Sequence, residues 1–182
     1  MASFNTLLDE ALDEWYTVRK GFIAEVKNIP AARISFRPTL ESRSALELVQ
    51  HVLENAIVTT EELTREDANL QRAPYEQLMN IYAPNIAHAD TKEKAIDLLV
   101  EQFRDAEHRF HECGEVYMMQ RVTLFNGKQK TRLSVLWQGI AHEMYHRGQI
   151  ALAARLLGLE PALTRELRMG GISSGPLSSS ET

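Results

Sequence analysis

"TKEKAIDLLVEQFRDAEHRFHECGEVY", residues 91–117, carries the most regular apolar pattern in the chain. Its apolar positions recur at alternating steps of three and four residues: Ile96, Leu99, Phe103, Ala106, Phe110, Cys113 and Tyr117. This spacing places the apolar side chains along one face of a helix, as in helical bundles. The stretch therefore predicts a long helix, from about Asp90 or Thr91 to Tyr117, that packs against other helices.

Three further stretches show helical spacing of apolar residues. They predict helices from Phe4 to about Asn28, from Ser42 or Ser44 to about Glu66, and from Thr131 or Ser134 to Gly158. Ser44 is followed three residues later by Glu47, which matches the capping box at the start of a helix. Gly158 with Pro161 just beyond it is typical of a helix end.

The connections carry turn residues and no long strand pattern. A short helix is expected between Pro74 and Pro84, and the pair Asn126-Gly127 indicates a turn or a small hairpin. The predicted fold class is therefore all-α, an antiparallel four-helix bundle with a crossover connection. We expect a single domain over residues 1–168, followed by a flexible Gly/Ser-rich tail over residues 169–182.

Composition narrows the class of protein. The chain has 182 residues, a net charge of −5 and no dense cluster of Lys and Arg, which disfavours a nucleic-acid partner. No signal peptide, membrane anchor or long apolar run is visible, so we expect no membrane partner and a cytoplasmic location. Cys113 is the one cysteine, which excludes a disulfide framework and a Cys-rich zinc finger. Histidine must therefore supply any metal site.

The segment "HEMYH", residues 142–146, spells His-Glu-x-x-His on the last predicted helix. His142 and His146 are four residues apart, so their Cβ atoms lie about 5–6 Å apart on one helix face and both imidazoles can reach one ion. His51, on the apolar stripe of the second helix, is the best candidate for a third ligand, because a polar residue in that setting needs a partner. The alternative is that these histidines are hydrogen-bonded core residues.

Two residues of the "HEMYH" segment, Glu143 and Tyr145, have two interpretations each. Glu143 occupies the position from which a protease glutamate activates metal-bound water, and it also lies four residues before Arg147, a favourable spacing for a surface ion pair. Tyr145 offers either a hydroxyl near the site or a packing ring. Gln149, three residues after His146, is placed to steer that imidazole ring.

A zinc-protease interpretation of the motif is disfavoured. Glu166 follows His146 at a separation at which a third zinc ligand occurs in one protease class, but the short motif alone has little specificity. Peptidases generally hold an extended substrate along a strand edge, and the sequence offers no sheet for this. Glu166 also lies beyond the break from Gly158 to Pro161, which is poor support for a ligand.

Two segments resemble a known family. "FRPTLESRSALELVQHVLENA", residues 36–56, is similar to the segment of DinB-like (YfiT-like) proteins in which a proline-containing connector leads to a helix with one ligand histidine. "GIAHEMYHRGQIALAARLLGLEP", residues 139–161, resembles the last helix of that family, in which His-x-x-x-His is followed by Arg-Gly-Gln and a Gly-x-x-Pro ending. The family often has a second histidine at the position of Tyr145.

The resemblance implies a four-helix bundle with an up-down-down-up crossover, often a homodimer, in which His51, His142 and His146 hold a divalent ion. Members with known chemistry are thiol-dependent: transferases that use bacillithiol or mycothiol, and a mycothiol-dependent isomerase. The family name comes from induction by DNA damage, which links it to stress responses.

On this basis we expect a metal-dependent enzyme that transfers a low-molecular-weight thiol to a small electrophile, both of them small-molecule partners. Glu143 and Tyr145 are the candidate catalytic residues, and Gln149 and Asn55 are expected beside the ligands. Zinc or nickel is the expected ion, with iron or manganese open. A metal-dependent hydrolase on the same histidines and a non-catalytic metal-binding bundle remain the alternatives.

Overall fold

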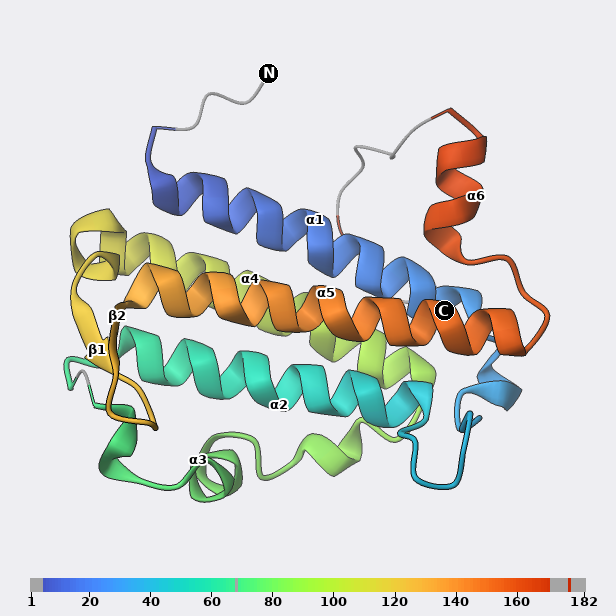
Figure 1. The fold of residues 1–182 in the computed structure, drawn as a ribbon, viewed down its shortest axis with the longest axis horizontal. Helices are drawn as coiled ribbons and strands as arrows, with labels where there is room; N and C mark the ends of the chain where they lie inside the picture. The colour runs from blue at the N-terminus through green and yellow to red at the C-terminus, as the bar shows by residue number, and fades with distance from the viewer. Residues whose placement is uncertain (1–4, 68, 171–176, 178–182) are drawn as a thin grey trace.

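The computed structural model describes residues 5–67, 69–170 and 177. Within these residues, four long helices form a bundle (Figure 1): α1 (Leu7–Asn28), α2 (Ala45–Thr64), α4 (Lys92–Met118) and α5 (Arg132–Leu156). Helices α1 and α5 run in one direction, and α2 and α4 run in the opposite direction. The predicted all-α bundle with a crossover connection is confirmed.

Helix α5 packs against α1 and α2, and α4 packs against the same two helices from the other side of the bundle. The crossover is the segment between the parallel helices α2 and α4, which travels the length of the bundle (Figure 1). It contains η2 (Leu70–Arg72), α3 (Tyr75–Tyr82) and η3 (Ile86–His88). The short helix expected between the two prolines is α3.

Side-chain caps define where the long helices begin. The Ser44 hydroxyl accepts a hydrogen bond from the Glu47 backbone N–H, and the Glu47 carboxylate accepts one from the Ser44 backbone N–H, so the predicted capping box is confirmed. Helix α5 begins after Thr131, whose hydroxyl accepts from the backbone N–H of Ser134. Beyond its end, Gly158 has a φ of 78°, the left-handed conformation expected after a helix.

The core consists of the apolar faces of the four long helices, and the stripe of α4 is buried from Ala95 to Phe110. At the end of this stripe Cys113 and Tyr117 are half-buried, with Tyr117 still packed against the core, and Met118 is fully buried. Gly114 has a φ of 73° inside α4 and kinks the helix before its last turn.

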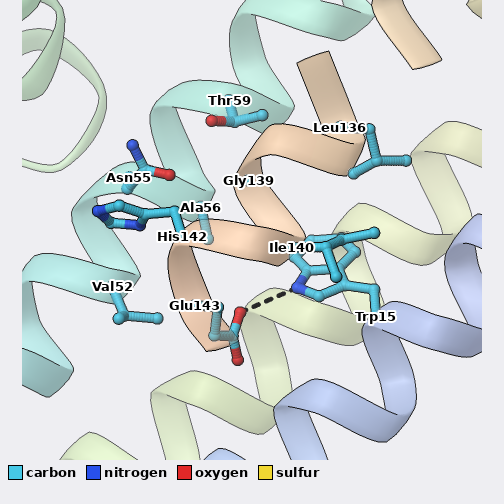
Figure 2. Close-up of a pocket in the computed structure, with 10 residues that line it drawn as sticks. All are labelled: Trp15, Val52, Asn55, Ala56, Thr59, Leu136, Gly139, Ile140, His142 and Glu143. Atoms are coloured by element: carbon cyan, nitrogen blue, oxygen red, sulfur yellow. Dashed lines mark hydrogen bonds between the residues drawn. The ribbon is translucent and has the colours of Figure 1, made fainter. Parts of the chain in front are cut away.

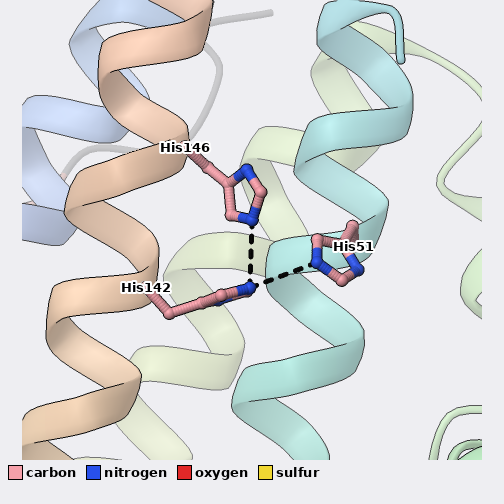
Figure 3. A group of neighbouring side chains, drawn as sticks. All are labelled: His51, His142 and His146. Carbon is pink, nitrogen blue, oxygen red and sulfur yellow. Dashed lines mark hydrogen bonds between the residues drawn. The ribbon is translucent and has the colours of Figure 1, made fainter. Parts of the chain in front are cut away.

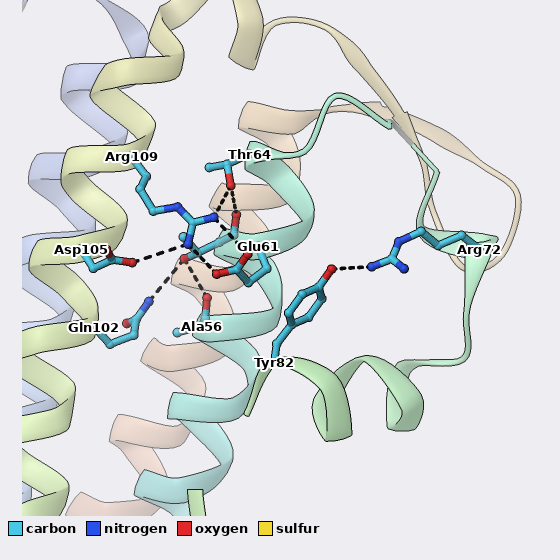
Figure 4. Close-up of polar contacts among 9 residues, drawn as sticks. Ala56, Glu61, Thr64, Arg72, Tyr82, Gln102, Asp105 and Arg109 are labelled. Atoms are coloured by element: carbon cyan, nitrogen blue, oxygen red, sulfur yellow. Dashed lines mark hydrogen bonds and ion pairs between the residues drawn. The ribbon is translucent and has the colours of Figure 1, made fainter. Parts of the chain in front are cut away.

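Polar contacts join α2 to α4 along the face away from α5. Figure 4 shows the Arg109 guanidinium of α4 between Glu61 and Thr64 of α2, with an Nη1 to Glu61 Oε1 distance of 2.6 Å. Two turns earlier on α4, Gln102 donates to the Thr60 hydroxyl of α2. These contacts fix the position of α2 along the bundle.

Two small elements complete the fold. Strands β1 (Arg121–Thr123) and β2 (Gln129–Thr131) pair antiparallel around Gly127, whose φ is 79°, so the predicted hairpin is confirmed. Helix α6 (Ala162–Arg168) was not predicted. Its first backbone N–H groups, from Ala162 and Leu163, donate to the buried Glu25 carboxylate of α1 at 2.9 and 3.0 Å, which anchors it.

The predicted flexible tail over residues 169–182 lies mostly outside the described residues. Of its described members, Leu177 is 8% exposed and belongs to the main core. Among the helices of the described ranges, none is long and apolar enough to cross a membrane.

Candidate metal centre

The histidines of the two antiparallel helices α2 and α5 meet in the groove between them. His51 lies two turns into α2, and His142 and His146 lie near the middle of α5 on consecutive turns. Figure 3 shows the three rings pointing toward one another from the two helices. His146 is buried, and the other two rings are half-buried.

The Nε2 atoms of the three rings converge. His142 Nε2 lies 3.2 Å from His51 Nε2 and 3.0 Å from His146 Nε2. One ligand atom from each of the three histidines lies within 4.8 Å of the others, and in the described part of the chain no carboxylate or thiol belongs to the group. The cluster is therefore an all-nitrogen donor set.

Hydrogen bonding alone does not satisfy this cluster. An imidazole Nε2 carries either one N–H or one in-plane lone pair, so His142 Nε2 can make a hydrogen bond to only one of its two close neighbours at a time. A partly buried polar group without a partner is costly. A cation between the three nitrogens would accept all three lone pairs at once.

The spacing of the nitrogens fits such a cation. Two nitrogen ligands at about 2.0–2.1 Å from one ion, at angles between octahedral and tetrahedral, lie about 2.9–3.4 Å from each other. The two measured Nε2 separations, 3.2 and 3.0 Å, lie within that range. The donor set and the geometry therefore fit a divalent ion that accepts imidazole ligands.

The site favours neutral imidazoles, the form that binds metals. Burial is the main cause that lowers the pKa of His51 to about 4, with further contributions from the charge of Arg43 and from the other two histidines. Burial likewise lowers the pKa values of His142 and His146. At neutral pH the three rings therefore carry lone pairs and no charge.

Gln149 lies against the ring of His146. Its side-chain oxygen is 2.7 Å from His146 Nδ1 and accepts the Nδ1–H hydrogen bond. This contact selects the tautomer that leaves Nε2 with its lone pair facing the other histidines. The sequence interpretation of Gln149 as a residue that steers the ring agrees with this geometry.

Asn55 lies one turn after His51 on α2 and lines the same cavity as His142 (Figure 2). Its amide nitrogen donates to the Tyr75 hydroxyl of α3 at 3.2 Å. Asn55 therefore connects the histidine groove to the crossover segment. Burial raises the pKa of Tyr75, so its hydroxyl stays protonated.

Glu143 faces the core. The interpretation of Glu143 as the partner of Arg147 in a surface ion pair was therefore wrong. The residue is only 2% exposed. Its carboxylate accepts hydrogen bonds from the Trp15 indole N–H at 3.0 Å and from Arg19 Nη2 at 2.9 Å (Figure 2 shows the Trp15 contact). Arg147 instead lies against Gly21 of α1, where a Cβ atom would be 2.2 Å from its guanidinium carbon.

Arg19 was missed by the sequence analysis. Its side chain is fully buried, and it also donates to the Leu99 backbone carbonyl at 2.7 Å and to Gln102 at 3.0 Å. Its position in the sequence could have indicated its burial, because Arg19 falls on the apolar stripe of α1, one turn after Trp15. A charged residue on such a stripe requires a buried partner of opposite charge.

Tyr145 and Glu166 lie outside the histidine cluster. Tyr145 is 65% exposed, and its ring contacts His146 edge-on with a centroid distance of 5.2 Å. Glu166 lies on α6, which packs against α1. The third imidazole near the "HEMYH" pair comes from His51, as the three-histidine hypothesis expects and the protease hypothesis does not.

A cavity of about 430 Å³ borders the histidines, and we call it the hairpin-side hollow. It lies between α2, α5, α3 and the loop of the β1–β2 hairpin, and its lining includes Val58, Thr59, Tyr75, Phe125, Gln138 and His142. Because His142 forms part of its wall, a molecule in this hollow would contact the histidine cluster directly.

The sequence matches the model of a known protein family. The sequence model of the DinB superfamily matches residues 14–150, more than half of the chain. The matched range includes His51, His142 and His146 and all four long helices except the ends of α1 and α5.

Two solved structures share the fold. A DinB-like protein, YjoA, from Bacillus subtilis is 18% identical with a TM-score of 0.60, and the match covers 82% of this chain and 92% of that chain. A mycothiol-dependent maleylpyruvate isomerase is 17% identical with a TM-score of 0.63, and the match covers 82% of this chain and 63% of the isomerase. At these identities the likeness concerns the fold alone.

Proposed function

The chain belongs to the DinB superfamily, and on that premise we propose that it is a metal-dependent enzyme that transfers a low-molecular-weight thiol to a small electrophile. The observation that carries the proposal is the convergence of three neutral imidazole Nε2 atoms at the wall of a cavity. A purely structural histidine cluster needs no adjoining cavity. A substrate site needs both ligand atoms and space.

His51, His142 and His146 would hold the ion through Nε2, with zinc or nickel as the expected metals. A divalent ion on three neutral ligands keeps its full charge and lowers the pKa of a thiol that binds to it. The protein supplies orientation around this chemistry. Gln149 fixes the tautomer of His146, and the buried pair of Glu143 and Arg19 holds this turn of α5 against α1.

We infer that Glu143 has a positioning role. Both of its oxygens already accept N–H hydrogen bonds from Trp15 and Arg19, which leaves it poorly placed to take a proton from a substrate. Tyr145 is exposed beside His146 and is free to contact a molecule at the surface of the site. Of the two candidate catalytic residues, Tyr145 therefore remains as a substrate contact.

A thiol as co-substrate is supported by the similarity to the mycothiol-dependent isomerase and by the nature of the site. In the proposed transfer, the thiol loses its proton to solvent and its sulfur forms a bond to the electrophilic carbon. The leaving group departs with the electron pair of the bond that breaks. Bacillithiol and mycothiol are the types of thiol that the family resemblance implies.

Metal content is the first test. Purified wild-type protein, His51→Ala and Glu166→Ala are compared by metal mass spectrometry after equilibration with zinc and with nickel. We expect the wild type and Glu166→Ala to retain the ion and His51→Ala to lose it. The proposal fails if the wild type retains no divalent ion, or if Glu166→Ala is the variant that loses it.

Turnover separates thiol transfer from the hydrolase alternative. A metal-loaded hydrolase consumes its electrophile without added thiol, whereas a transferase requires the thiol and consumes it stoichiometrically. The loss of free thiol and the loss of electrophile are followed in parallel. Equal electrophile loss with and without thiol would contradict the proposal and favour hydrolysis.

We also propose that a second copy of the chain covers the outer face of α5, which would make the protein a homodimer. Trp137, Met144 and Leu156 lie on this side and are 41–57% exposed. Gly148 lies among them, and a Cβ atom there would meet nothing within 4 Å in the chain itself. A helix that is apolar on its outer side and carries a glycine there suits close packing with another helix.

Light scattering tests this dimer. We expect a dimer mass for the wild type and a monomer mass for Leu156→Glu, because a buried carboxylate would oppose association. Leu40→Glu is the matched control, since Leu40 is 92% exposed in the connector before α2. A monomeric wild type would contradict the dimer.

A further inference from the structure

The groove between α2 and α5 contains a second hollow, on the opposite side of the histidines from the hairpin-side hollow. We call it the connector-side hollow, because the residues before α2 form its rim; its volume is about 570 Å³. Its lining includes Glu41, Ser42, Arg43, Leu48, Gln149 and Leu152.

The order of the lining residues along α2 and α5 places the two hollows on opposite sides of the histidines. On α2, Leu48 of the connector-side hollow precedes His51, and Val58 of the hairpin-side hollow follows it. On α5, which runs in the opposite direction, Gln149 follows His146, and Gln138 precedes His142. The histidine cluster therefore lies between the two hollows: His142 lines the hairpin-side hollow, and Gln149, which contacts His146, lines the connector-side hollow.

The hairpin-side hollow provides no free charge. Among its described lining residues, Glu62 is the one with a full charge, and its carboxylate accepts from Arg72 Nε at 3.3 Å. Figure 4 shows Arg72 reaching the Tyr82 hydroxyl from η2, so its guanidinium is engaged on both sides. The rest of the wall is apolar or carries neutral amide and hydroxyl groups. This hollow suits an uncharged, largely apolar molecule.

The connector-side hollow differs in carrying a free cation. Arg43 is exposed on its rim and forms no ion pair with any residue in the described ranges. Arg43 lines the same hollow as Gln149, whose side-chain oxygen lies 2.7 Å from His146 Nδ1, so its charge lies close to the histidine cluster. Burial raises the pKa of Glu54 despite the nearby charge of Arg43, and Glu41 on the same rim has the opposite charge to Arg43.

Given the proposed thiol transfer, we propose that the thiol is one with a carboxylate group, which bacillithiol has and mycothiol lacks. Arg43 binds this carboxylate in the connector-side hollow, while the uncharged electrophile occupies the hairpin-side hollow. A guanidinium matches the planar geometry of a carboxylate and binds it through paired hydrogen bonds. This division brings the sulfur and the electrophile to the histidines from opposite sides. It makes Arg43 a residue that determines thiol specificity.

Binding to the cobalt-loaded protein tests this assignment without turnover. Cobalt(II) at the histidines reports thiol binding through its visible absorption, and two thiols of similar size are titrated: 3-mercaptopropionate, which has a carboxylate, and 2-mercaptoethanol, which does not. We expect the wild type to bind 3-mercaptopropionate about threefold to tenfold more tightly at low salt. Arg43→Gln is expected to remove this preference and to leave 2-mercaptoethanol binding unchanged.

Arg104→Gln is the matched control, because Arg104 is an exposed arginine on α4 outside the lining of both hollows. Preserved preference in Arg104→Gln and lost preference in Arg43→Gln would support the assignment. Equal affinity of the wild type for the two thiols, or a preference that survives in Arg43→Gln, would overturn it and leave the thiol-transfer proposal standing. If neither thiol binds the cobalt-loaded wild type, both proposals fail.

Discussion

Two polar clusters lie on neighbouring residues of α5 and face different helices. Glu143 points toward α1, where Arg19 and Trp15 occupy both of its oxygens. His142 points toward α2, where its Nε2 lies close to two other nitrogens, only one of which it can hydrogen-bond at a time. The first cluster is complete within the protein, and the second becomes complete only when it binds something else.

This difference separates a structural cluster from a ligand site. A buried charge pair with satisfied hydrogen bonds holds two helices in one arrangement, and removing either partner leaves an uncompensated charge. A cluster of neutral bases around a common point contributes little to the fold by itself, because its lone pairs lack partners. We therefore expect opposite outcomes from substitutions in the two clusters: lost stability in the first and lost metal binding in the second.

The largest effect is expected from breaking the pair of Arg19 and Glu143. Glu143→Leu leaves the fully buried Arg19 without a counter-charge, which costs about 3–5 kcal/mol of unfolding free energy. Denaturant unfolding of the metal-free protein measures this change. As a control, Lys94→Ala removes an exposed pair with Asp90 and is expected to cost about 0.3–0.5 kcal/mol.

The double variant Arg19→Met with Glu143→Leu distinguishes the cost of an unpaired buried charge from the cost of altered packing. It replaces both charges by apolar side chains, so no buried charge remains unpaired, and we expect it to recover most of the lost stability. If the double variant is as unstable as Glu143→Leu alone, the cost arises from packing and not from the unpaired charge.

His51→Ala is expected to give the opposite result. With two ligands left, affinity for a divalent ion should fall by more than the 10- to 100-fold that loss of a supporting contact costs. The unfolding free energy of the metal-free protein should change by no more than about 1 kcal/mol, because a half-buried ring without a full set of partners is removed. Chelator competition measures the affinity, and a stability loss as large as that of Glu143→Leu would make the cluster structural.

The two clusters also show which parts of the site could be predicted from the sequence and which could not. The helices, the capping box at Ser44 and the placement of His51, His142 and His146 on helix faces all follow from local spacing. The partner of Glu143 does not, because it depends on α1 lying beside α5, 124 residues away from Glu143 in sequence. From spacing alone, Arg147 was the nearer cation, and the packing of Arg147 against Gly21 could not be foreseen.

The kink in α4 and helix α6 show the same limit on the fold. Gly114 takes a left-handed conformation that interrupts a regular apolar stripe, and its sequence neighbours give no sign of it. Helix α6 is short and is anchored by Glu25, a buried carboxylate of α1 that accepts two backbone N–H groups. The position of α6 depends on this tertiary contact, whereas periodicity reports only local structure.

A smaller effect is expected from Gln149, which contacts the histidine cluster without belonging to it. Gln149→Ala removes the acceptor for His146 Nδ1–H, so the ring is no longer held in one tautomer and orientation. Metal affinity should fall by about 10- to 100-fold, and Gln149→Glu should retain most of it because a carboxylate oxygen accepts the same hydrogen bond. Competition with a chelator distinguishes the two variants, and equal losses in both would contradict the tautomer argument.

Burial of the histidines is also expected to make the stability of the metal-free protein depend on pH. Burial lowers the pKa of His51 to about 4 in the folded state, from 6.5 in the unfolded chain. Between these values the unfolded chain binds more protons than the folded one, so the free energy of unfolding decreases as the pH falls from about 6.5 to about 4. His142 and His146 act in the same direction, since their pKa values are also lowered by burial.

Denaturant unfolding at several pH values, in the presence of chelator, measures this slope. His51→Ala removes one of the three groups and should have a shallower slope than the wild type across the same window. The buried pair of Glu143 and Arg19 remains in both proteins, so any acid sensitivity it confers cancels in the comparison. Identical slopes would mean that His51 gains protons equally in both states, and the ring would then be more accessible to water than its place in the α2–α5 groove allows.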